Sequence, residues 1–498
     1  MDHGGDSQAV FRKTEELMAV GEYTLALAEA EQVVGALPPD NGAARGALAG
    51  YQIDVGSRLE RDDIVRTGIA GLEALRGVLE DGHVDYCLGN GHLALGGREE
   101  GNAVGAQPSL QKAVEHFERA LKNRRDDQVR TNLATALQYQ GRYIEALDEY
   151  DLVVQANPKH EIALAQRGRC LWLIAALLRH HGGLLVGALN DHLRAIECVV
   201  GRPVPDSYTD AVRRLLKRGV RPQIPEKVIG TPTQEWIIGA QLGLDPCPIC
   251  KTASPGAFDV FPLSGPLRMK RPGGSYEAIL DTFNALCRTY GTARWCLMRG
   301  LGVVELDPGE DIVLAPTMLH AHTSVRAGLT VTAATQFFMV FQQASCLLNL
   351  IFELGHNLRQ VDFWRVWAPP DPPKGQRRSA PLAPGELHPK LALSRNFALN
   401  ALYRLACSLD VRQGRHGSLR DLRNKLAHRI VVVGTEDRES SEYVMMRPET
   451  IEMGTLGLAR LAKAAIWYLA WTVQGEEDAV LERTPGAVIL DGPGVLRV

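Results

Sequence analysis

The fold of the carboxy-terminal part of the chain is decided by the segment LRDLRNKLAHR, residues 419–429. Leu419, Leu422 and Leu426 recur at positions i, i+3 and i+7, which places them on one face of an α-helix. We expect this apolar face to pack against the core of a helical bundle. The polar residues between the leucines then lie on the outer face of the same helix.

Asn424 and His428 form the candidate active site on this outer face, together with Arg423. At 100° per residue, Asn424 and His428 lie about 150° or more from the centre of the leucine face. Arg423 lies beside that face, and its side chain is long enough to bend towards the other two. Histidine can act as base or acid near neutral pH, and arginine offers fork-shaped donors to phosphate. Asn424 can orient the phosphate or the imidazole, so RNA could be cleaved by its own 2′-hydroxyl without a metal.

Local charge supports RNA as the substrate. The segment 412–429 contains six Lys or Arg residues and one acidic residue, in a chain of net charge −3 and pI about 6.5. Because the chain as a whole is not basic, an RNA site must be a local patch. The candidate RNA-binding residues are Arg412, Arg415, Arg420, Lys425 and Arg429.

The spacing of Arg and His alone also fits a solvated helix face. Arg76 and His83 show a similar spacing elsewhere in the chain, and we assign them no role. Three features favour the candidate at 423–428: the Asn directly after Arg, the amphipathic helix and the surrounding basic residues.

Two stretches of the amino-terminal half repeat one pattern. Gly21 and Gly141 are each followed by Tyr, Ala and Pro at the same offsets of 2, 5 and 17 residues. Small residues let two helices approach closely, and proline is typical of the start of the next unit. Gly89, Ala113, Phe117 and Ala120 indicate a third unit with a loop inserted at 98–108, and a looser unit follows from Ala163.

This pattern resembles a tetratricopeptide repeat (TPR) array over residues 8–200. A generic helical bundle is the alternative, because the period is broken. Residues 220–331 are richer in Pro and Gly and indicate a mixed α/β connecting region, with extended segments at 257–261 and 302–306 and a helix at 276–299.

Helical periodicity returns in residues 332–475, for which we predict a four-helix bundle. The expected helices cover residues 333–367, 390–411, 418–430 and 454–474. A proline-rich loop at 368–389 cannot be helical, and an extended pair at 430–434 and 442–446 separates the last two helices. Residues 476–498 form a tail. The predicted fold class is therefore mainly α.

The runs Asn400–Leu405 and Leu422–Arg429 resemble the HEPN superfamily, in particular its branch fused to amino-terminal TPR repeats. Further matches lie at 278–284 and 293–296 and at Phe363-Trp364, so the resemblance spans about residues 85–475. It implies a bundle that forms a homodimer with two clusters facing one composite cleft. It also implies metal-independent RNA cleavage and a role in stress response or antiviral defence. Relatives often carry a polar residue just before the His, where this chain has Ala427.

Cys247 and Cys250 form a CxxC motif, which is half of a zinc-binding pattern. Cys287, Cys296, His320 or His322 could complete the site, although no spacing compels it. A turn carrying two thiols is the alternative, and no other cofactor is predicted.

Other candidate residues have simpler interpretations. His180 and His181 fit a solvated helix end, whereas Trp467, Tyr468 and Trp471 recur at helical spacing and fit core or dimer packing. No Gly-rich phosphate-binding loop is present in the sequence, which argues against nucleotide hydrolysis.

The chain is expected to be cytoplasmic. Its amino terminus lacks the features of a signal peptide, and the apolar stretches 170–178 and 464–473 are too short to span a membrane. Nine scattered cysteines suit a reducing compartment.

The sequence therefore predicts an endoribonuclease with a protein or peptide ligand in its repeat groove. A non-catalytic adaptor that dimerises and binds RNA or protein is the alternative. A toxin held silent by a separate antitoxin is a third.

Overall fold

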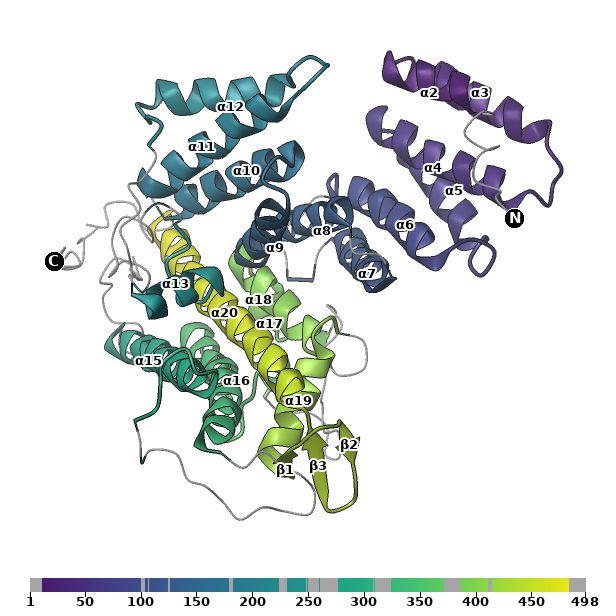
Figure 1. Ribbon diagram of the computed structural model, residues 1–498. Helices are drawn as coiled ribbons and strands as arrows, with labels where there is room; N and C mark the ends of the chain where they lie inside the picture. The colour runs from purple at the N-terminus through teal and green to yellow at the C-terminus, as the bar shows by residue number, and fades with distance from the viewer. Residues whose placement is uncertain are drawn as a thin grey trace. The chain divides into compact units, whose positions relative to one another are not determined.

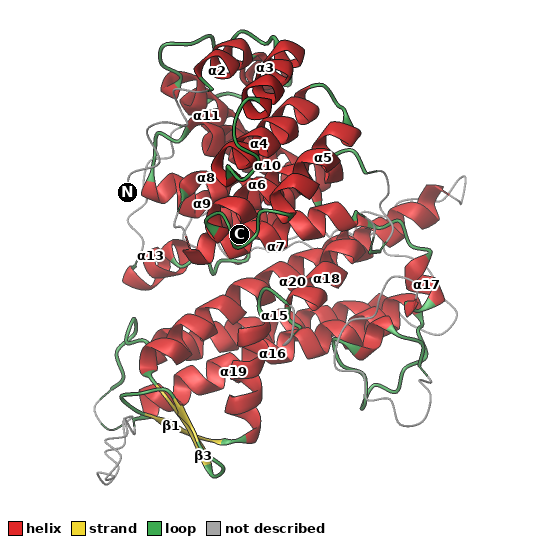
Figure 2. Cartoon of the chain, turned by 90° about the vertical axis from the view of Figure 1, so that its right-hand side faces the viewer, coloured by secondary structure: helices red, strands yellow, loops and turns green. Residues whose placement is uncertain are grey.

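The computed structural model is helical almost throughout, with one small sheet (Figures 1 and 2). It describes the chain except for residues 1–10, 100–103, 106, 124–125, 179–181, 224–230, 248, 250–258, 260–275, 308, 310–323, 371–385, 411–413 and 483–498. The chain divides into two compact units. The first comprises residues 1–101, 106–140 and 149–166, and the second comprises residues 102–105, 141–148 and 167–498.

The first unit consists of consecutive helices, and each helix from α2 to α7 contacts the next one. Its helices are α2 (Arg12–Ala19), α3 (Tyr23–Gly35), α4 (Gly42–Arg58), α5 (Asp62–Glu73), α6 (Asp81–Gly96), α7 (Pro108–Asn123) and α8 (Asp127–Tyr139), with parts of α9 (Tyr143–Ala156) and α10 (Glu161–Leu177). The predicted helical repeats are confirmed.

The repeated glycines adopt the same left-handed turn conformation in both copies. Gly21 and Gly141 have φ angles of +83° and +75°, and each lies between two helices. Ala26 and Ala146, five residues later, are fully buried. In the third predicted unit, a Cβ atom at Gly89 would lie 2.5 Å from the ring of Phe117, so α6 and α7 approach closely at that point.

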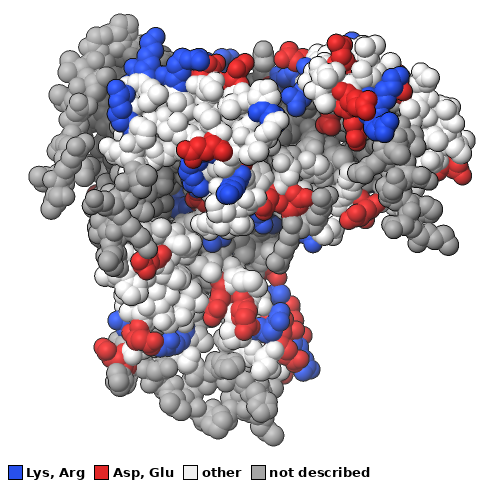
Figure 3. All heavy atoms as spheres, turned by 45° about the horizontal axis from the view of Figure 1, so that its top comes forward, with Lys and Arg blue, Asp and Glu red and all other residues white. Residues whose placement is uncertain are grey.

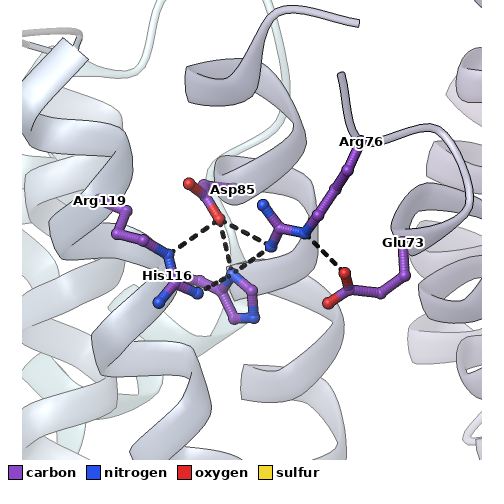
Figure 4. Close-up of polar contacts among 5 residues, drawn as sticks. All are labelled: Glu73, Arg76, Asp85, His116 and Arg119. Atoms are coloured by element: carbon purple, nitrogen blue, oxygen red, sulfur yellow. Dashed lines mark hydrogen bonds and ion pairs between the residues drawn. The ribbon is translucent and has the colours of Figure 1, made fainter. Parts of the chain in front are cut away.

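A buried carboxylate links α6 and α7 in the first unit (Figure 4). Asp85 Oδ1 lies 2.8 Å from His116 Nδ1, and it accepts hydrogen bonds from Arg76 at 3.1 Å and Arg119 at 3.2 Å. Arg76 also donates to Glu73 at 2.6 Å. Arg76 therefore has structural partners within the first unit.

Burial shifts the pKa of Asp85 and the pKa of His92 in opposite directions, because it disfavours the charged form of each group. It raises the pKa of Asp85, but hydrogen bonds from His116 and Arg76 and the charge of Arg119 leave that pKa below its ordinary value. His92 stacks on His116 at 5.4 Å, and burial lowers the pKa of His92 to about 4, with His116 and Lys112 acting in the same direction. The neutral form of His92 is thus favoured in the fold.

The second unit contains the carboxy-terminal bundle. Its long helices are α15 (Tyr276–Gly300), α16 (Val325–Phe352), α18 (Phe397–Ser408), α19 (Gly417–His428) and α20 (Pro448–Glu482), with α16 contacting α15, α19 and α20. The shorter helices are η2 (Arg365–Trp367) and α17 (Pro389–Ala392). Helices α11 (Gly182–Cys198), α12 (Asp206–Lys217) and α13 (Pro232–Gly239) precede the bundle in the chain.

The bundle begins earlier than predicted. Residues 276–300, assigned to the connecting region, form α15 and pack along α16, so the bundle starts at residue 276 and not at 332. The described part of residues 220–331 contains helices and turns but no strand. Residues 302–306 form a turn and bend followed by irregular backbone, and 257–261 lie outside the described residues apart from Asp259.

Three predicted helix boundaries were wrong. The helix expected at 333–367 spans 325–352, because Glu353 adopts a left-handed conformation with φ +49° and ends it. The helix expected at 390–411 is divided into α17 and α18. Helix α20 extends six residues before and eight after the predicted 454–474, and it enters the predicted tail.

The extended pair is confirmed as a small sheet of order β1-β3-β2. Strand β1 (Ile430–Val433) pairs in parallel with β3 (Tyr443–Met446), and β2 (Arg438–Glu439), which was not predicted, pairs antiparallel with β3. Most of the proline-rich loop, residues 371–385, lies outside the described residues.

The first turns of α9, residues 141–148, pack on α18 and α20. The Tyr468 hydroxyl donates to Glu145 at 3.1 Å, and buried Lys463 donates to Asp148 at 2.7 Å. Trp467, Tyr468 and Trp471 are all buried, which agrees with a role in core packing.

Among the described helices, α16 has the length and composition of a membrane span. Its most apolar window has a mean hydropathy of 1.2, and 56% of that window is buried within the fold. A core helix of a soluble protein passes the same test.

We expect acid to destabilise the first unit through His92. An unfolded histidine titrates near pH 6.5, so between about pH 6.5 and 4 the unfolded state binds more protons than the fold. Stability therefore falls with decreasing pH, by at most about 1.4 kcal/mol per pH unit for one such group. Asp85 contributes to this loss only below about pH 4, because its pKa is lowered.

Hydrogen exchange of the α6 amides at pH 7 and pH 5, corrected for intrinsic exchange rates, measures this loss. His92→Gln should reduce it, whereas His83→Gln, an exposed position on the same helix, should leave it unchanged. Equal losses in the wild type and His92→Gln would show that another group is responsible.

Candidate active site

Helix α19 holds the candidate residues in the orientation that the leucine pattern predicts. Leu422 and Leu426 are buried with 5% and 9% exposure, and α19 contacts both α16 and α20. Gly454 of α20 lies directly against Leu422, where a Cβ atom would overlap the leucine side chain. Helix α19 ends at His428 because Arg429 is extended, with φ −126° and ψ 159°, and leads into β1.

Arg423, Asn424 and His428 form one cluster at the carboxyl end of α19. The Arg423 Nη1 atom donates to Asn424 Oδ1 at 3.0 Å and lies 3.2 Å from His428 Nε2. His428 is exposed, while Arg423 and Asn424 are half-buried. The structure therefore brings together the three residues that the sequence selected as catalytic.

The contact between Arg423 and His428 fixes the role of the imidazole nitrogen. Arginine has N–H donors and no acceptor, so His428 Nε2 must accept this hydrogen bond. The proton of the neutral ring is then assigned to Nδ1. Asn424 holds the guanidinium through its carbonyl oxygen, so in this arrangement it orients Arg423 and not the imidazole.

Two aromatic rings that sequence reasoning missed lie under the arginines of α19. The Arg423 Cζ atom lies 4.4 Å from the ring centre of Phe338, and the Arg420 Cζ atom lies 3.8 Å from that of Trp364. Burial lowers the pKa of both guanidinium groups, and the charge of Asp362 partly offsets this effect. Arginine remains charged in spite of such a shift.

Four of the five candidate RNA-binding residues lie in the described part of the chain. Lys425 pairs with Asp421 at 3.0 Å and with Glu439 at 3.2 Å, and Arg429 lies 3.5 Å from Glu439. Arg420 stacks on Trp364. Arg415 lies in the turn before α19, and its positive charge disfavours the charged form of buried Arg142.

Arg412 lies outside the described residues. The excess of basic residues in the segment 412–429 is partly neutralised by Glu439, which lies on β2 and contacts Lys425 and Arg429. On the face of the molecule drawn in Figure 3, acidic and basic side chains are interspersed.

A hollow of about 620 Å³ lies on another side of α19. It is lined by α19 residues, the small sheet and the start of α20, with Asp421, Asp437 and Glu439 among its acidic groups. Arg423, Asn424 and His428 do not line it. In the candidate active site of a single chain, His428 is exposed and Arg423 and Asn424 are half-buried.

The zinc prediction is not tested by this geometry. Cys247 is buried, but Cys250, His320 and His322 lie outside the described residues. Among the described residues no group of three potential metal ligands is close enough to hold an ion. His180 and His181 also lie outside the described part.

The tautomer of His428 is testable. In the wild type, nitrogen NMR at a pH where the ring is neutral should show the proton on Nδ1, because Nε2 accepts from Arg423. Arg423→Ala removes that donor, and the Nε2–H form should become populated. Retention of the same tautomer in Arg423→Ala would mean that the contact does not govern the ring; Arg299→Ala, on α15, is the control.

Comparison with known proteins agrees with the predicted domain type. Residues 274–476 match the sequence model of a family described as LA2681-like HEPN. No curated protein matches the chain. Among solved structures, 16 chains match.

One of them is YrrB, described as a TPR protein with an unusual peptide-binding site. It is 20% identical, and the alignment covers 43% of this chain and 94% of that chain with a TM-score of 0.26. A score this low does not establish a common fold, so the repeat assignment rests on the helices of the chain itself. The family match covers α15 to α20 and includes the Arg423–His428 cluster. Residues 274–476 of this chain are thus similar in sequence to the LA2681-like HEPN family.

Proposed function

We propose that the protein is a metal-independent endoribonuclease that cleaves RNA at the Arg423–His428 cluster. The observation that carries this proposal is the 3.2 Å contact between Arg423 Nη1 and His428 Nε2 at the exposed end of α19. It combines a permanent cation with a group that exchanges protons near neutral pH. The HEPN family match over the same residues supports it.

The proposed reaction is attack of a ribose 2′-oxygen on the adjacent phosphorus. The 2′-hydroxyl loses its proton to an imidazole, the new P–O bond forms, and the bond to the 5′-oxygen of the next nucleotide breaks. That oxygen leaves with a proton from an acid. The products are a 2′,3′-cyclic phosphate and a 5′-hydroxyl, and no oxidant, reductant or water is consumed.

Arg423 stabilises the charge that develops on the phosphate oxygens. Its guanidinium carries five N–H donors, so it can bind phosphate and keep its bond to Asn424 Oδ1. Transfer of the Nη1 contact from His428 to the phosphate frees Nε2 to accept the 2′-hydroxyl proton. Asn424 thus keeps the guanidinium near the phosphate while the imidazole works as the base.

The cluster of one chain has a single side chain that can exchange protons near neutral pH. Arg423 stays charged and Asn424 does not titrate, so one cluster supplies either the base or the acid at a given moment. A homodimer with two clusters at one cleft supplies both. We therefore propose a HEPN dimer as the active form.

The helical repeats are proposed to bind a protein or peptide that controls the nuclease in stress response or defence. Their consecutive hairpins form the kind of surface that holds peptides or helices. A non-catalytic adaptor is the second candidate, and the ion pairs of Lys425 and Arg429 with Glu439 favour it, because they reduce the charge available to RNA.

Incubation with total RNA in EDTA tests the proposed reaction. Wild-type protein should give fragments with 2′,3′-cyclic phosphate ends, and His428→Ala should reduce the rate by about 10²–10⁴-fold, as expected for loss of an acid or base. His83→Ala, from the other Arg/His pair in the chain, should cleave normally. Cleavage that persists in both Arg423→Ala and His428→Ala would refute the site.

Mixing experiments test the dimer. If both protons pass through two copies of His428, an equal mixture of wild-type and His428→Ala chains after subunit exchange should retain about a quarter of the activity. Independent sites would retain about half. Sedimentation of the wild type as a monomer at the assay concentration would contradict the dimer directly.

A further inference from the structure

Two guanidinium groups, those of Arg420 and Arg423, lie over two stacked aromatic rings. The rings of Phe338 and Trp364 are called the shelf below. The rings of Phe338 and Trp364 are 5.7 Å apart with an interplanar angle of 16°. Arg423 lies over Phe338 and Arg420 over Trp364, at 4.4 Å and 3.8 Å. Both rings are only 5% exposed, so they form a fixed surface.

The shelf defines the direction of both side chains. Arg420 and Arg423 are i, i+3 neighbours on α19, which places them on adjacent positions of the helix surface. A cation over an aromatic face is attracted by the ring, and a guanidinium can stack flat on it. Each arginine therefore presents the edge of its guanidinium while its face is covered.

The local charge at the shelf is positive. Asp362 acts on both arginines, but its carboxylate also lies 3.4 Å from Arg365 Nε and accepts hydrogen bonds from the backbone of Trp364 and Arg365. Asp410 adds a further negative charge near Arg420. In the described part of the chain, Arg365, Arg420 and Arg423 thus lie near the two carboxylates of Asp362 and Asp410, whereas Lys425 contacts Asp421 and Glu439.

We propose that Arg420 is a second phosphate-binding residue and that Phe338 and Trp364 are positioning residues, so that single-stranded RNA is gripped at two neighbouring phosphates. This proposal rests on the proposed nuclease function. Arg423 holds the phosphate that is cleaved, and Arg420 holds the next one. Each guanidinium is positioned by an aromatic ring, and Arg423 also by its hydrogen bond to Asn424. The two arginines thereby set the distance between the two bound phosphates and place the 2′-oxygen near His428.

The salt dependence of RNA binding tests the second phosphate contact separately from cleavage. A fluorescent single-stranded RNA with 2′-O-methyl groups binds but cannot be cut. Each phosphate contact contributes about 0.7 to the slope of log affinity against log salt, so Arg420→Ala should lower the magnitude of the slope by about 0.7. Arg299→Ala is the matched control, because Arg299 stacks on exposed Trp295 at 4.9 Å on α15.

Arg420→Lys separates charge from position. Lysine keeps the charge but cannot stack as a planar group, so the slope should persist while cleavage of normal RNA slows by between about 3-fold and about 30-fold. Phe338→Leu retains an apolar side chain and should lower kcat more than it raises KM. Thermal unfolding of each variant separates these effects from misfolding.

Three outcomes decide the proposal. Arg420→Ala with the slope of Arg299→Ala would overturn the second phosphate contact. Arg420→Lys and Phe338→Leu with wild-type kcat would overturn the positioning role. A slope lowered by about 0.7 in Arg420→Ala, with no cleavage by the wild type, would support the second phosphate contact while the nuclease proposal fails.

Discussion

The rotation of α19 about its axis depends on the contact between Leu422 and Gly454. A side chain at Gly454 would occupy the space that Leu422 fills, and Gly457 lies similarly close to Leu419. The apolar face of α19 therefore reaches the backbone of α20, and the helix cannot rotate without exposing its leucines. Because α-helical geometry is regular, this single constraint also fixes the directions of Arg423, Asn424 and His428.

The same constraint distributes the charges of α19 between two environments. On one side, Lys425 and Arg429 meet Glu439 from the small sheet and are partly neutralised. On the other side, Arg420 and Arg423 meet aromatic rings of α16 and the following loop. Aromatic contact holds a guanidinium in place without using its N–H donors. Arg420 and Arg423 are therefore the residues of α19 that we propose for phosphate binding.

Local patterns predicted the parts of the fold that depend on neighbouring residues. Leu422 and Leu426 are buried, and Asn424 and His428 lie with Arg423 on one surface, as helical periodicity requires. The repeated glycine turns also follow from local sequence. By contrast, α16 ends because Glu353 adopts a left-handed conformation, which a sequence usually signals by a glycine at that position. No periodicity in the sequence marks such a position.

Contacts between distant segments could not be predicted in this way. The sequence did not single out Phe338 or Trp364 as site residues, because their pairing with Arg423 and Arg420 exists only once α16 and α19 have packed. Glu439 was absent from the local charge count for the same reason. Both errors concern electrostatics, which depends on distance in space and not along the chain. A count of basic residues in a helix therefore overstates an RNA surface until the partners of each charge are known.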